Sequence, residues 1–459
     1  MANKNLLTYA AKVSSVEQTS YAPFSLVNGV PISTIYAFLA KVDPWVDEND
    51  PDAPTQDQAT LKKIFKNIFV AKQVYASDIS PVVERRDWVI DTVYDFYRDD
   101  IDMFEQDPVT GKQVLHYYVK NRYDQVFKCL WNNNGVPSTI EPYFEPGSYG
   151  TNNLFLSPDV AHGGDGYKWK YIYSIDTGSK VKFMDRNWMP VVIGATLAGP
   201  LSAAGAGSID VINVTDGGSG YDQANAEVVV VITGDGYGAV ATANVVDGAV
   251  SEITVVSPGT NYSYVSANIV STIGSGATLV APTSPIGGHG YDPVAEIGCH
   301  HVMFTCQFEQ DEGGIIPTDI DFHQIGLLTS PAEQTADGII PAYKNIYKTT
   351  TDLVMAPGFG AYTNDETIYQ GTSIENATFV GTVLSFDVAS NVIRVLNTTG
   401  TLATNKPVFG DSSKTTRTLL SYSLPEFVNF SGYLSFIENR TGIQRSADGI
   451  EQIKIVLGY

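Results

Sequence analysis

Cysteine and basic residues are scarce in this chain of 459 residues. Its three cysteines, Cys129, Cys299 and Cys306, are an odd number without the spacing of a disulfide framework, which favours reduced thiols in a cytosolic compartment. Only 28 Lys and Arg stand against 50 Asp and Glu, and no basic run exceeds two residues. Binding to nucleic acid or to an anionic membrane surface needs clustered basic side chains. The sequence therefore predicts neither nucleic acid nor a membrane as a partner.

The chain also lacks an uninterrupted apolar segment. Its first residues do not form the apolar core of a signal peptide. The charge-free stretch from Met189 to Ile209 is long enough to raise the question of a membrane span, but Pro190, Pro200 and many small residues interrupt it. We expect a strand followed by a hinge there, and a soluble intracellular product.

Motifs that carry chemistry are missing as well. The densest set of metal-ligand types is Cys299, His300, His301 and Cys306, but its spacing matches no structural zinc site, and adjacent histidines on a strand should point to opposite faces. The Gly-rich turn at 217–220 lacks the Lys and Ser or Thr of a phosphate-binding loop. The sequence predicts no catalytic residues, no cofactor and no metal, and a protein that is not an enzyme.

Strand signals dominate what is present. The composition includes 26 Tyr, 20 Phe, 41 Gly and 23 Pro, which favours β structure with many turns. Residues 125–131 and 167–175 have strand character, and in the second run aromatic side chains alternate with Lys168 and Lys170, as in a half-exposed strand. These patterns predict a mainly β, multidomain protein with a β-sandwich-like core and few short helices.

One helix is expected near residues 57–72. Leu61, Ile64 and Phe65 recur at helical spacing, and Thr55 with Gln58 three residues later is typical of a capping box. The acidic loop before this helix matches no EF-hand and is interrupted by proline, so a solvated loop is the better interpretation than a calcium site.

Two small all-β domains are expected as insertions in the core. Residues 201–292 are Gly-rich and contain a repeat in which Tyr221 and Tyr262 correspond, a spacing of 41 residues. Residues 370–424 contain short strands and tight turns typical of a small barrel. The core then comprises residues 1–200, residues 293–369 and the C-terminal strands of 425–459, with a turn expected at 438–442.

Four consecutive residues, Arg85, Arg86, Asp87 and Trp88, combine two guanidinium groups with a carboxylate and an indole. Such a set can bind an anion, since guanidinium groups form bidentate hydrogen bonds with oxyanions. The preferred interpretation is an ion-paired structural corner of the first β domain.

Several short stretches occur in an order that resembles the gene product eight family of T4-like phage baseplate wedge subunits. The resemblance covers residues 30–195, 295–370 and 430–459, and leaves the two insertions outside it. It rests on Thr34-Ile35-Tyr36-Ala37-Phe38 with Asp43-Pro44-Trp45, Arg85-Arg86-Asp87-Trp88, Tyr123-Asp124-Gln125-Val126-Phe127-Lys128-Cys129-Leu130, Asp165-Gly166-Tyr167-Lys168-Trp169-Lys170-Tyr171-Ile172, and Ser431-Gly432-Tyr433-Leu434-Ser435-Phe436-Ile437-Glu438-Asn439-Arg440.

This resemblance implies a structural protein of the virion tail baseplate, assembled in the host cytoplasm. The implied partners are a second copy of the chain, in a homodimer, and other baseplate wedge proteins; the family supplies no catalytic residues. Two alternatives stay open at this point. One is a tail-associated protein that binds carbohydrate or a receptor, and the other is a phage-encoded hydrolase on a β scaffold.

Overall fold

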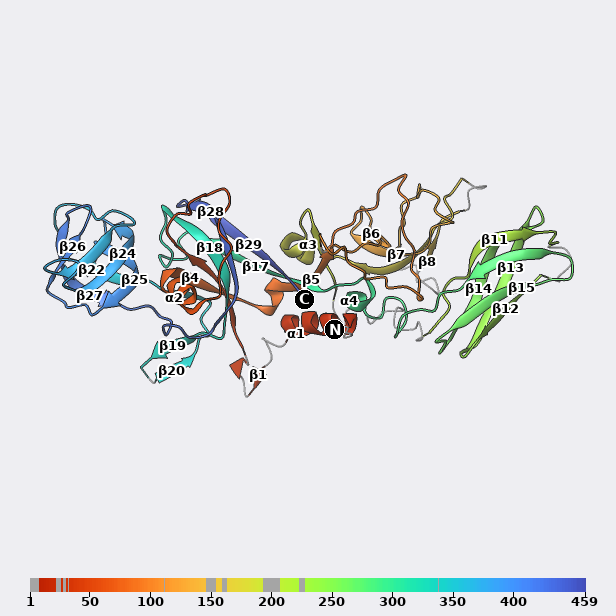
Figure 1. The fold of residues 1–459 in the computed structure, drawn as a ribbon, viewed down its shortest axis with the longest axis horizontal. Helices are drawn as coiled ribbons and strands as arrows, with labels where there is room; N and C mark the ends of the chain where they lie inside the picture. Colours follow the sequence, from red (N-terminus) through yellow and green to blue (C-terminus); the bar gives the residue numbers. More distant parts are fainter. Residues whose placement is uncertain are drawn as a thin grey trace, which may run out of the picture. The chain divides into compact units, whose positions relative to one another are not determined.

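The computed structural model describes residues 8–21, 26–27, 30–31, 33–110, 112–145, 154–158, 163–192, 207–222, 228–336 and 338–459. Strands make up 46% and helices 9% of the structure, which confirms the prediction of a mainly β, multidomain fold. The chain divides into two compact units (Figure 1). The first unit comprises Met1–Gln18, Ser80–Met303 and Val456–Tyr459, and the second comprises Thr19–Ile79 and Phe304–Ile455. Residues 1–200, predicted as one part of the core, are thus shared between the units.

The centre of the first unit is a four-stranded sheet of order β6-β7-β9-β8. Its core is aromatic, because Phe127, Tyr167 and Trp169 are fully buried around it. A second small sheet follows the order β10-β5-β17-β29. The elements of this unit outside the insertion are β5 (Ile79–Glu84), β6 (Tyr118–Lys120), β7 (Gln125–Trp131), β8 (Leu154–Leu156), β9 (Lys168–Ser174), β10 (Trp188–Pro190), α3 (Thr177–Phe183), α4 (Pro293–Glu296), most of α1 (Tyr9–Tyr21), and parts of β17 (His301–Glu309) and β29 (Ile450–Gly458).

The Gly-rich insertion belongs to the first unit and forms six antiparallel strands around its own apolar cluster. The expected hinge before it, residues 193–206, lies outside the described residues. The pairs are β11 with β16, β12 with β15 and β13 with β14, so each strand of one half pairs with a strand of the other. The strands are β11 (Asn213–Ser219), β12 (Val229–Gly234), β13 (Tyr237–Val246), β14 (Ala249–Thr260), β15 (Val265–Val270) and β16 (Ser275–Val280).

The tyrosine of each sequence repeat packs on a glycine of the other repeat. Tyr221 of the first repeat packs on Gly274 of the second, and its hydroxyl accepts a hydrogen bond from the Ala277 amide at 3.2 Å. Tyr262 of the second repeat packs on Gly236 of the first. The 41-residue repeat is therefore a repeat of structure, and neither half completes its core without the other.

In the second unit a five-stranded sheet of order β21-β4-β3-β18-β28 carries the core. Its strands are β3 (Ile35–Ala40), β4 (Ile68–Val74), β18 (Ile320–Thr329), β21 (Ile346–Lys348) and β28 (Tyr433–Arg445). Short elements of the same unit are β1 (Leu26–Val27), β2 (Val30–Pro31), η2 (Ala76–Asp78), β19 (Ala332–Thr335) and β20 (Gly338–Pro341).

The predicted helix near 57–72 is shorter than expected. Helix α2 spans Gln58–Asn67 and is capped by Asp57, whose carboxylate accepts hydrogen bonds from two backbone amides; the expected cap, Thr55, lies outside it. The chain then continues directly into β4, because the apolar run after Asn67 suits a buried strand between β3 and β21.

The C-terminal prediction needs one correction. Residues 438–442, expected as a turn, lie within β28: Glu438 and Asn439 pair with Ile325 and Gln324 of β18, and after an irregularity at 440–442 the ladder resumes with Ile443 opposite Phe322. The turn comes later, where the Gly449 amide donates to the Ser446 carbonyl at 3.1 Å.

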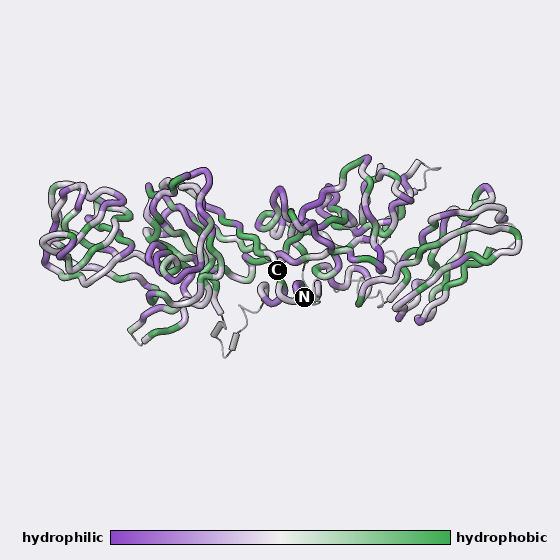
Figure 2. Tube along the Cα trace, viewed as in Figure 1, coloured by the Kyte–Doolittle hydropathy of each residue, from purple (hydrophilic) through white to green (hydrophobic). Residues whose placement is uncertain are grey.

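A closed six-stranded barrel forms the rest of the second unit, in the order β22-β25-β24-β23-β26-β27. Its first strand begins at Thr351, well before the predicted boundary at residue 370, because two further strands are needed to close the sheet. Apolar residues recur along these strands, and their buried members form one cluster (Figure 2). The strands are β22 (Thr351–Met355), β23 (Thr367–Gly371), β24 (Ala377–Asp387), β25 (Val392–Gly400), β26 (Pro407–Gly410) and β27 (Thr416–Ser423).

Candidate functional site

A cavity of about 670 Å³ opens in the first unit beside α1, here called the α1 cavity. Its walls come from α1, from residues 97–104 and from residues 285–296. Three large apolar side chains that line it, Ile101, Ile286 and Tyr291, are exposed to solvent. Cavities of this size with mostly apolar walls are typical binding sites.

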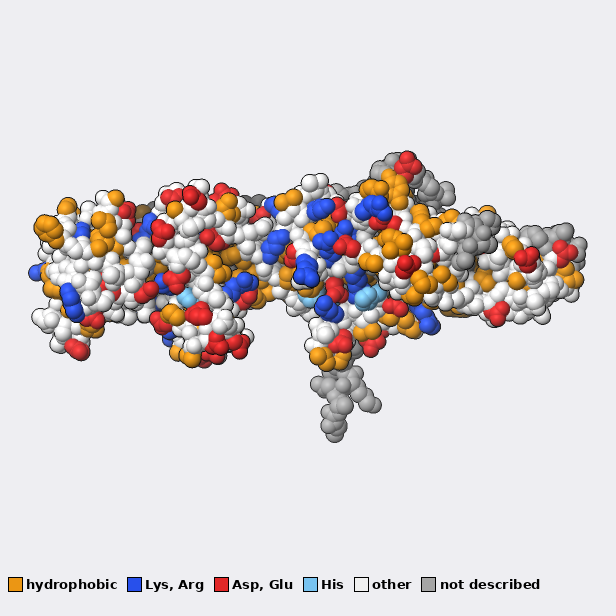
Figure 3. All heavy atoms as spheres, turned by 90° about the horizontal axis from the view of Figure 1, so that it is seen from above, with side chains coloured by type: hydrophobic (Ala, Val, Ile, Leu, Met, Phe, Trp, Pro, Cys, Tyr) orange, Lys and Arg blue, Asp and Glu red, His pale blue; other side chains and the backbone are white. Residues whose placement is uncertain are grey.

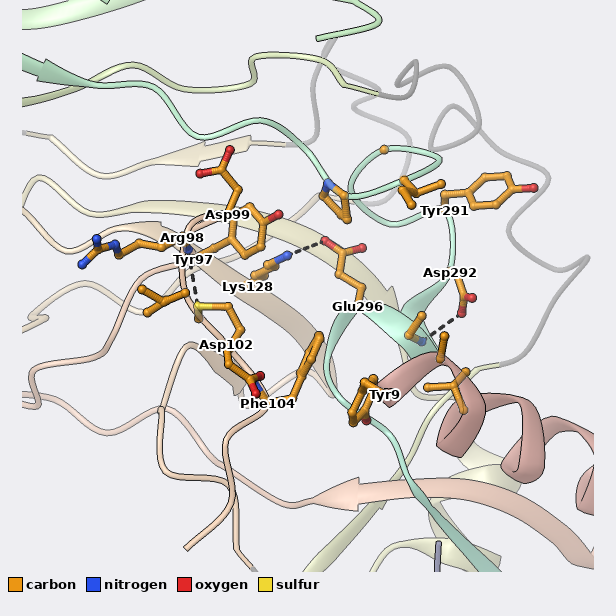
Figure 4. Close-up of a pocket in the computed structure, with 18 of the residues that line it drawn as sticks. Tyr9, Tyr97, Arg98, Asp99, Asp102, Phe104, Lys128, Tyr291, Asp292 and Glu296 are labelled. Atoms are coloured by element: carbon orange, nitrogen blue, oxygen red, sulfur yellow. Dashed lines mark hydrogen bonds and ion pairs between the residues drawn. The ribbon is translucent and has the colours of Figure 1, made fainter. Parts of the chain in front are cut away.

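Two buried ionisable side chains, Lys128 and Glu296, line the α1 cavity (Figure 4), and a third, His289, contacts Glu296. Lys128 Nζ is 3.1 Å from Glu296 Oε1, and His289 Nδ1 is 2.6 Å from the same oxygen. The Lys128 ammonium also lies 3.5 Å from the centroid of the Tyr97 ring, a close cation–π contact. None of the three ionisable side chains is more than 3% exposed.

Their electrostatics favour a fixed ion pair. Burial raises the pKa of Glu296, but the charge of Lys128 outweighs it and the net effect lowers that pKa to about 2. Burial, with the nearby Lys128 charge, lowers the pKa of His289, so its neutral ring donates from Nδ1 to Glu296. That proton prevents Nδ1 from accepting a hydrogen bond from Lys128 3.3 Å away. Lys128 and Glu296 thus neutralise each other.

A second buried ion pair lies beside the first. Lys170 is the cross-strand neighbour of Lys128, and its Nζ is 2.8 Å from Asp210 Oδ2. Asp210 precedes the first strand of the Gly-rich insertion, and Glu296 follows its last strand. Both ends of the insertion are therefore fixed to the same sheet by buried charge pairs.

The predicted position of one of these lysines was wrong. Lys170 was expected on an exposed strand face but is only 2% exposed, because the beginning of the insertion covers that face. Lys168 also turns inward, where its Nζ donates to the Ile212 carbonyl at 3.3 Å.

The four residues of the predicted corner lie just after β5. Arg86 is 9% exposed and donates to the carbonyls of Leu115 and Gln113, at 2.5 and 2.9 Å, and to Glu84 at 3.0 Å. Arg85 binds Asp87 with two nitrogens, at 3.0 and 2.8 Å. These contacts engage both terminal nitrogens of Arg86 and the Asp87-facing side of Arg85 within the protein; Arg86 Nε has no partner among the described residues but is buried, which leaves little capacity for an external anion.

Trp88 completes this corner. Its indole nitrogen donates to Ser138 Oγ at 3.1 Å, and its ring packs against the aromatic cluster of the first unit. Its backbone amide donates to the Lys120 carbonyl at 2.8 Å. A structural role for the four residues remains a prediction, which the substitutions discussed below test.

The histidine pair is arranged differently from the expectation. His300 precedes β17 and His301 is its first residue, so the two side chains do not point to opposite faces of one strand. Their ring centroids are only 4.2 Å apart. Both line a smaller cavity of about 340 Å³ with Trp188. Burial lowers the pKa of His301 to about 4, so this side chain is neutral near pH 7.

No group of three or more His, Cys, Asp or Glu among the described residues is arranged to hold a metal ion. In the same part of the chain, no helix is both long and apolar enough to cross a membrane. No protein-family model matches the sequence, and no curated protein matches it.

Proposed function

We propose that this chain is a structural subunit of a contractile-tailed phage baseplate wedge. In this proposal it forms a homodimer, joins other wedge proteins during tail assembly in the host cytoplasm, and remains in the virion. The proposal rests on the ordered set of sequence stretches that resemble the gene product eight family of T4-like phages.

The observation that carries the proposal is where these stretches lie in the fold. They coincide with strands of the main sheets of the two units, β7 and β9 in the four-stranded sheet and β3 and β28 in the five-stranded one, and with the corner after β5. Both additional β modules, the Gly-rich insertion and most of the barrel, lie outside them. Stretches that resemble a structural family and lie in the main sheets, with the additional modules outside them, support an assembly protein.

The chemistry of the α1 cavity supports the same proposal. Its two buried charged groups, Lys128 and Glu296, are paired with each other, whereas a catalytic acid or base needs access to a proton of the substrate. The charge distribution disfavours nucleic acid and anionic surfaces as the alternative partners: residues 187–343 contain no Lys or Arg. Acidic but no basic side chains appear over β11–β16 in the space-filling view (Figure 3).

Light scattering coupled to size exclusion, over a concentration series, tests the proposal. We expect a dimer mass that persists on dilution, and co-elution with other wedge proteins. A monomer at every concentration would contradict the homodimer, and a trimer would favour a receptor-binding fibre.

A receptor-binding function is the second candidate. The cavity beside His301 combines Trp188 and Tyr118 with the polar side chains of Glu84 and Asn187. An indole next to hydrogen-bonding groups suits a sugar ring. Binding to a glycan array that Trp188→Ala abolishes, without a change in thermal stability, would favour this candidate.

A further inference from the structure

Phe359 is fully exposed at 101% relative accessibility, although phenylalanine is among the residues most often buried. It lies on the loop of residues 356–363 between β22 and β23, here called the Phe359 loop, with glycine on either side. A phenyl ring in water adds no buried apolar surface to the stability of its own chain. An isolated aromatic tip of this kind suits insertion into a pocket of another molecule.

The base of the Phe359 loop is held in place. Arg417 donates to the Gly360 carbonyl and, at 2.6 Å, to Asn391 Oδ1. Thr415 Oγ1 donates to the Ala361 carbonyl at 3.0 Å. These bonds fix the backbone directly after Phe359, and the Ala356 amide, which donates to the Thr418 carbonyl at 2.8 Å, fixes the start of the loop, so that less conformational entropy would be lost when the ring is bound.

A cation accompanies the phenyl ring. Lys414 directly precedes Thr415, and its side chain is 79% exposed. Its nearest carboxylate, Asp411, is 3.7 Å away and itself exposed, so that this pair is weak. The Phe359 loop and the turn that is bonded to it through Thr415 therefore present an aromatic group and a positive charge.

The α1 cavity has the complementary character. Its walls include the aromatic rings of Tyr9 and Phe104, which stack at 4.2 Å. Glu17, Asp102 and Asp292 also line it. In the described part of the chain none of these three carboxylates forms an ion pair with Lys or Arg, whereas the cavity's Arg98 is held by Asp100 at 2.7 Å. The cavity thus suits an apolar group accompanied by a cation.

We propose that Phe359 of one copy inserts into the α1 cavity of a second copy, with Lys414 facing the carboxylates of that cavity. The inference rests on the proposed homodimer and names its contact. A second copy can supply both halves of the contact, since each chain carries one Phe359 loop and one α1 cavity. When the exchange is reciprocal, the two identical contacts close a twofold dimer.

Cross-linking between copies tests the contact while leaving the phenyl ring in place. Ala361 lies on the exposed Phe359 loop, and Ala10 is an exposed residue of the α1 cavity. The three native cysteines are buried, so Ala361→Cys and Ala10→Cys each provide one accessible thiol. We expect a short bismaleimide to join the two purified variants, once mixed, into a covalent dimer.

Two matched variants control for random collision. Val388→Cys replaces an exposed residue elsewhere on the barrel, and Val109→Cys an exposed residue of the first unit outside the α1 cavity. Val388→Cys mixed with Ala10→Cys should give little covalent dimer, and so should Val109→Cys mixed with Ala361→Cys. Equal yields from all mixtures would overturn the inference.

Removal of the phenyl ring gives a second readout. Phe359→Ala should weaken the dimer at least about 30-fold, which corresponds to about 2 kcal/mol, whereas Val388→Ala should not change it. A Phe359→Ala dimer of unchanged affinity would overturn the inference and leave the homodimer intact. A wild-type chain that stays monomeric would overturn the homodimer itself.

Discussion

Tyr262 lies against Gly236 so closely that a Cβ atom at Gly236 would be 2.4 Å from Cγ of the tyrosine ring. The corresponding contact in the other direction, of Tyr221 with Gly274, leaves 2.3 Å to the nearest ring carbon. Such distances are far shorter than van der Waals contact, so that only glycine fits at either position. The two contacts connect the halves of the Gly-rich insertion.

Gly236→Ala should therefore destabilise the insertion. The added methyl group must displace the Tyr262 ring, at a cost of about 1–3 kcal/mol for an overpacked core. Chymotrypsin digestion with and without urea measures the effect, because trypsin has no Lys or Arg to cut between residues 187 and 343. Gly358→Ala is the control, since its Cβ would lie 3.5 Å from Arg417. Equal resistance of both variants would contradict the argument.

The buried pair of Lys128 and Glu296 leads to a second prediction. Glu296→Gln leaves the Lys128 charge buried without a carboxylate, and we expect the free energy of unfolding to fall by about 3–5 kcal/mol. Denaturant unfolding measures this loss. Asp43→Asn is the control, because the Asp43–Lys63 pair is exposed and should not affect the midpoint.

Acid sensitivity is the third prediction. The pKa of Glu296 is about 2 in the folded chain, whereas the usual value is 4.5. The ionised Glu296 side chain therefore contributes its full stabilisation above pH 4.5, and this contribution is lost as the pH falls toward 2. His289, whose pKa is lowered in the fold, adds to the loss below pH 6.5, because the unfolded chain takes up its proton first. Thermal melts between pH 7 and pH 3 should show a steady fall, and Glu296→Gln should make it shallower below pH 4.5. An equally steep fall in the variant would count against Glu296 as a source.

Local patterns in the sequence were sufficient to predict much of the strand content. Residues 125–131 form β7 as expected, since a run of large β-branched and aromatic residues has few alternatives to a buried strand. The run at 68–72 was less decisive, because Ile68 and Phe69 fit the helical spacing of α2 as well as a strand. Tertiary contacts with β3 and β21 decide between the two.

The α1 cavity and its charges were beyond prediction from local patterns. Glu296 is 168 positions from Lys128, and Asp210 is 40 positions from Lys170. A lysine in a strand is normally exposed, and only the path of the insertion across the sheet reverses this. Lysines alternate with aromatic residues at 168–171, which is unusual. This pattern is the signal that could have indicated lysines buried against acidic partners.

The corner after β5 provides the fourth prediction. Arg86→Ala removes the donor to two backbone carbonyls and to Glu84, so we expect a loss of about 2–3 kcal/mol in the free energy of unfolding. Arg85→Ala is the matched control, because its more exposed pair with Asp87 should contribute less than about 1 kcal/mol. Thermal unfolding of both variants measures the difference. An Arg86→Ala variant with unchanged stability and dimerisation would show that the structural assignment is wrong.

The cysteines give the fifth prediction. Burial raises the pKa of Cys299 and of Cys306 to about 12, and that of Cys129 well above its usual value. Because only the thiolate attacks a disulfide reagent, the folded chain should not react with an aromatic disulfide at pH 8, and three thiols should react after denaturation. Counting thiols by absorbance under both conditions tests this expectation. One rapidly reacting thiol in the folded chain would refute it, and the cross-linking design would then need a background without that cysteine.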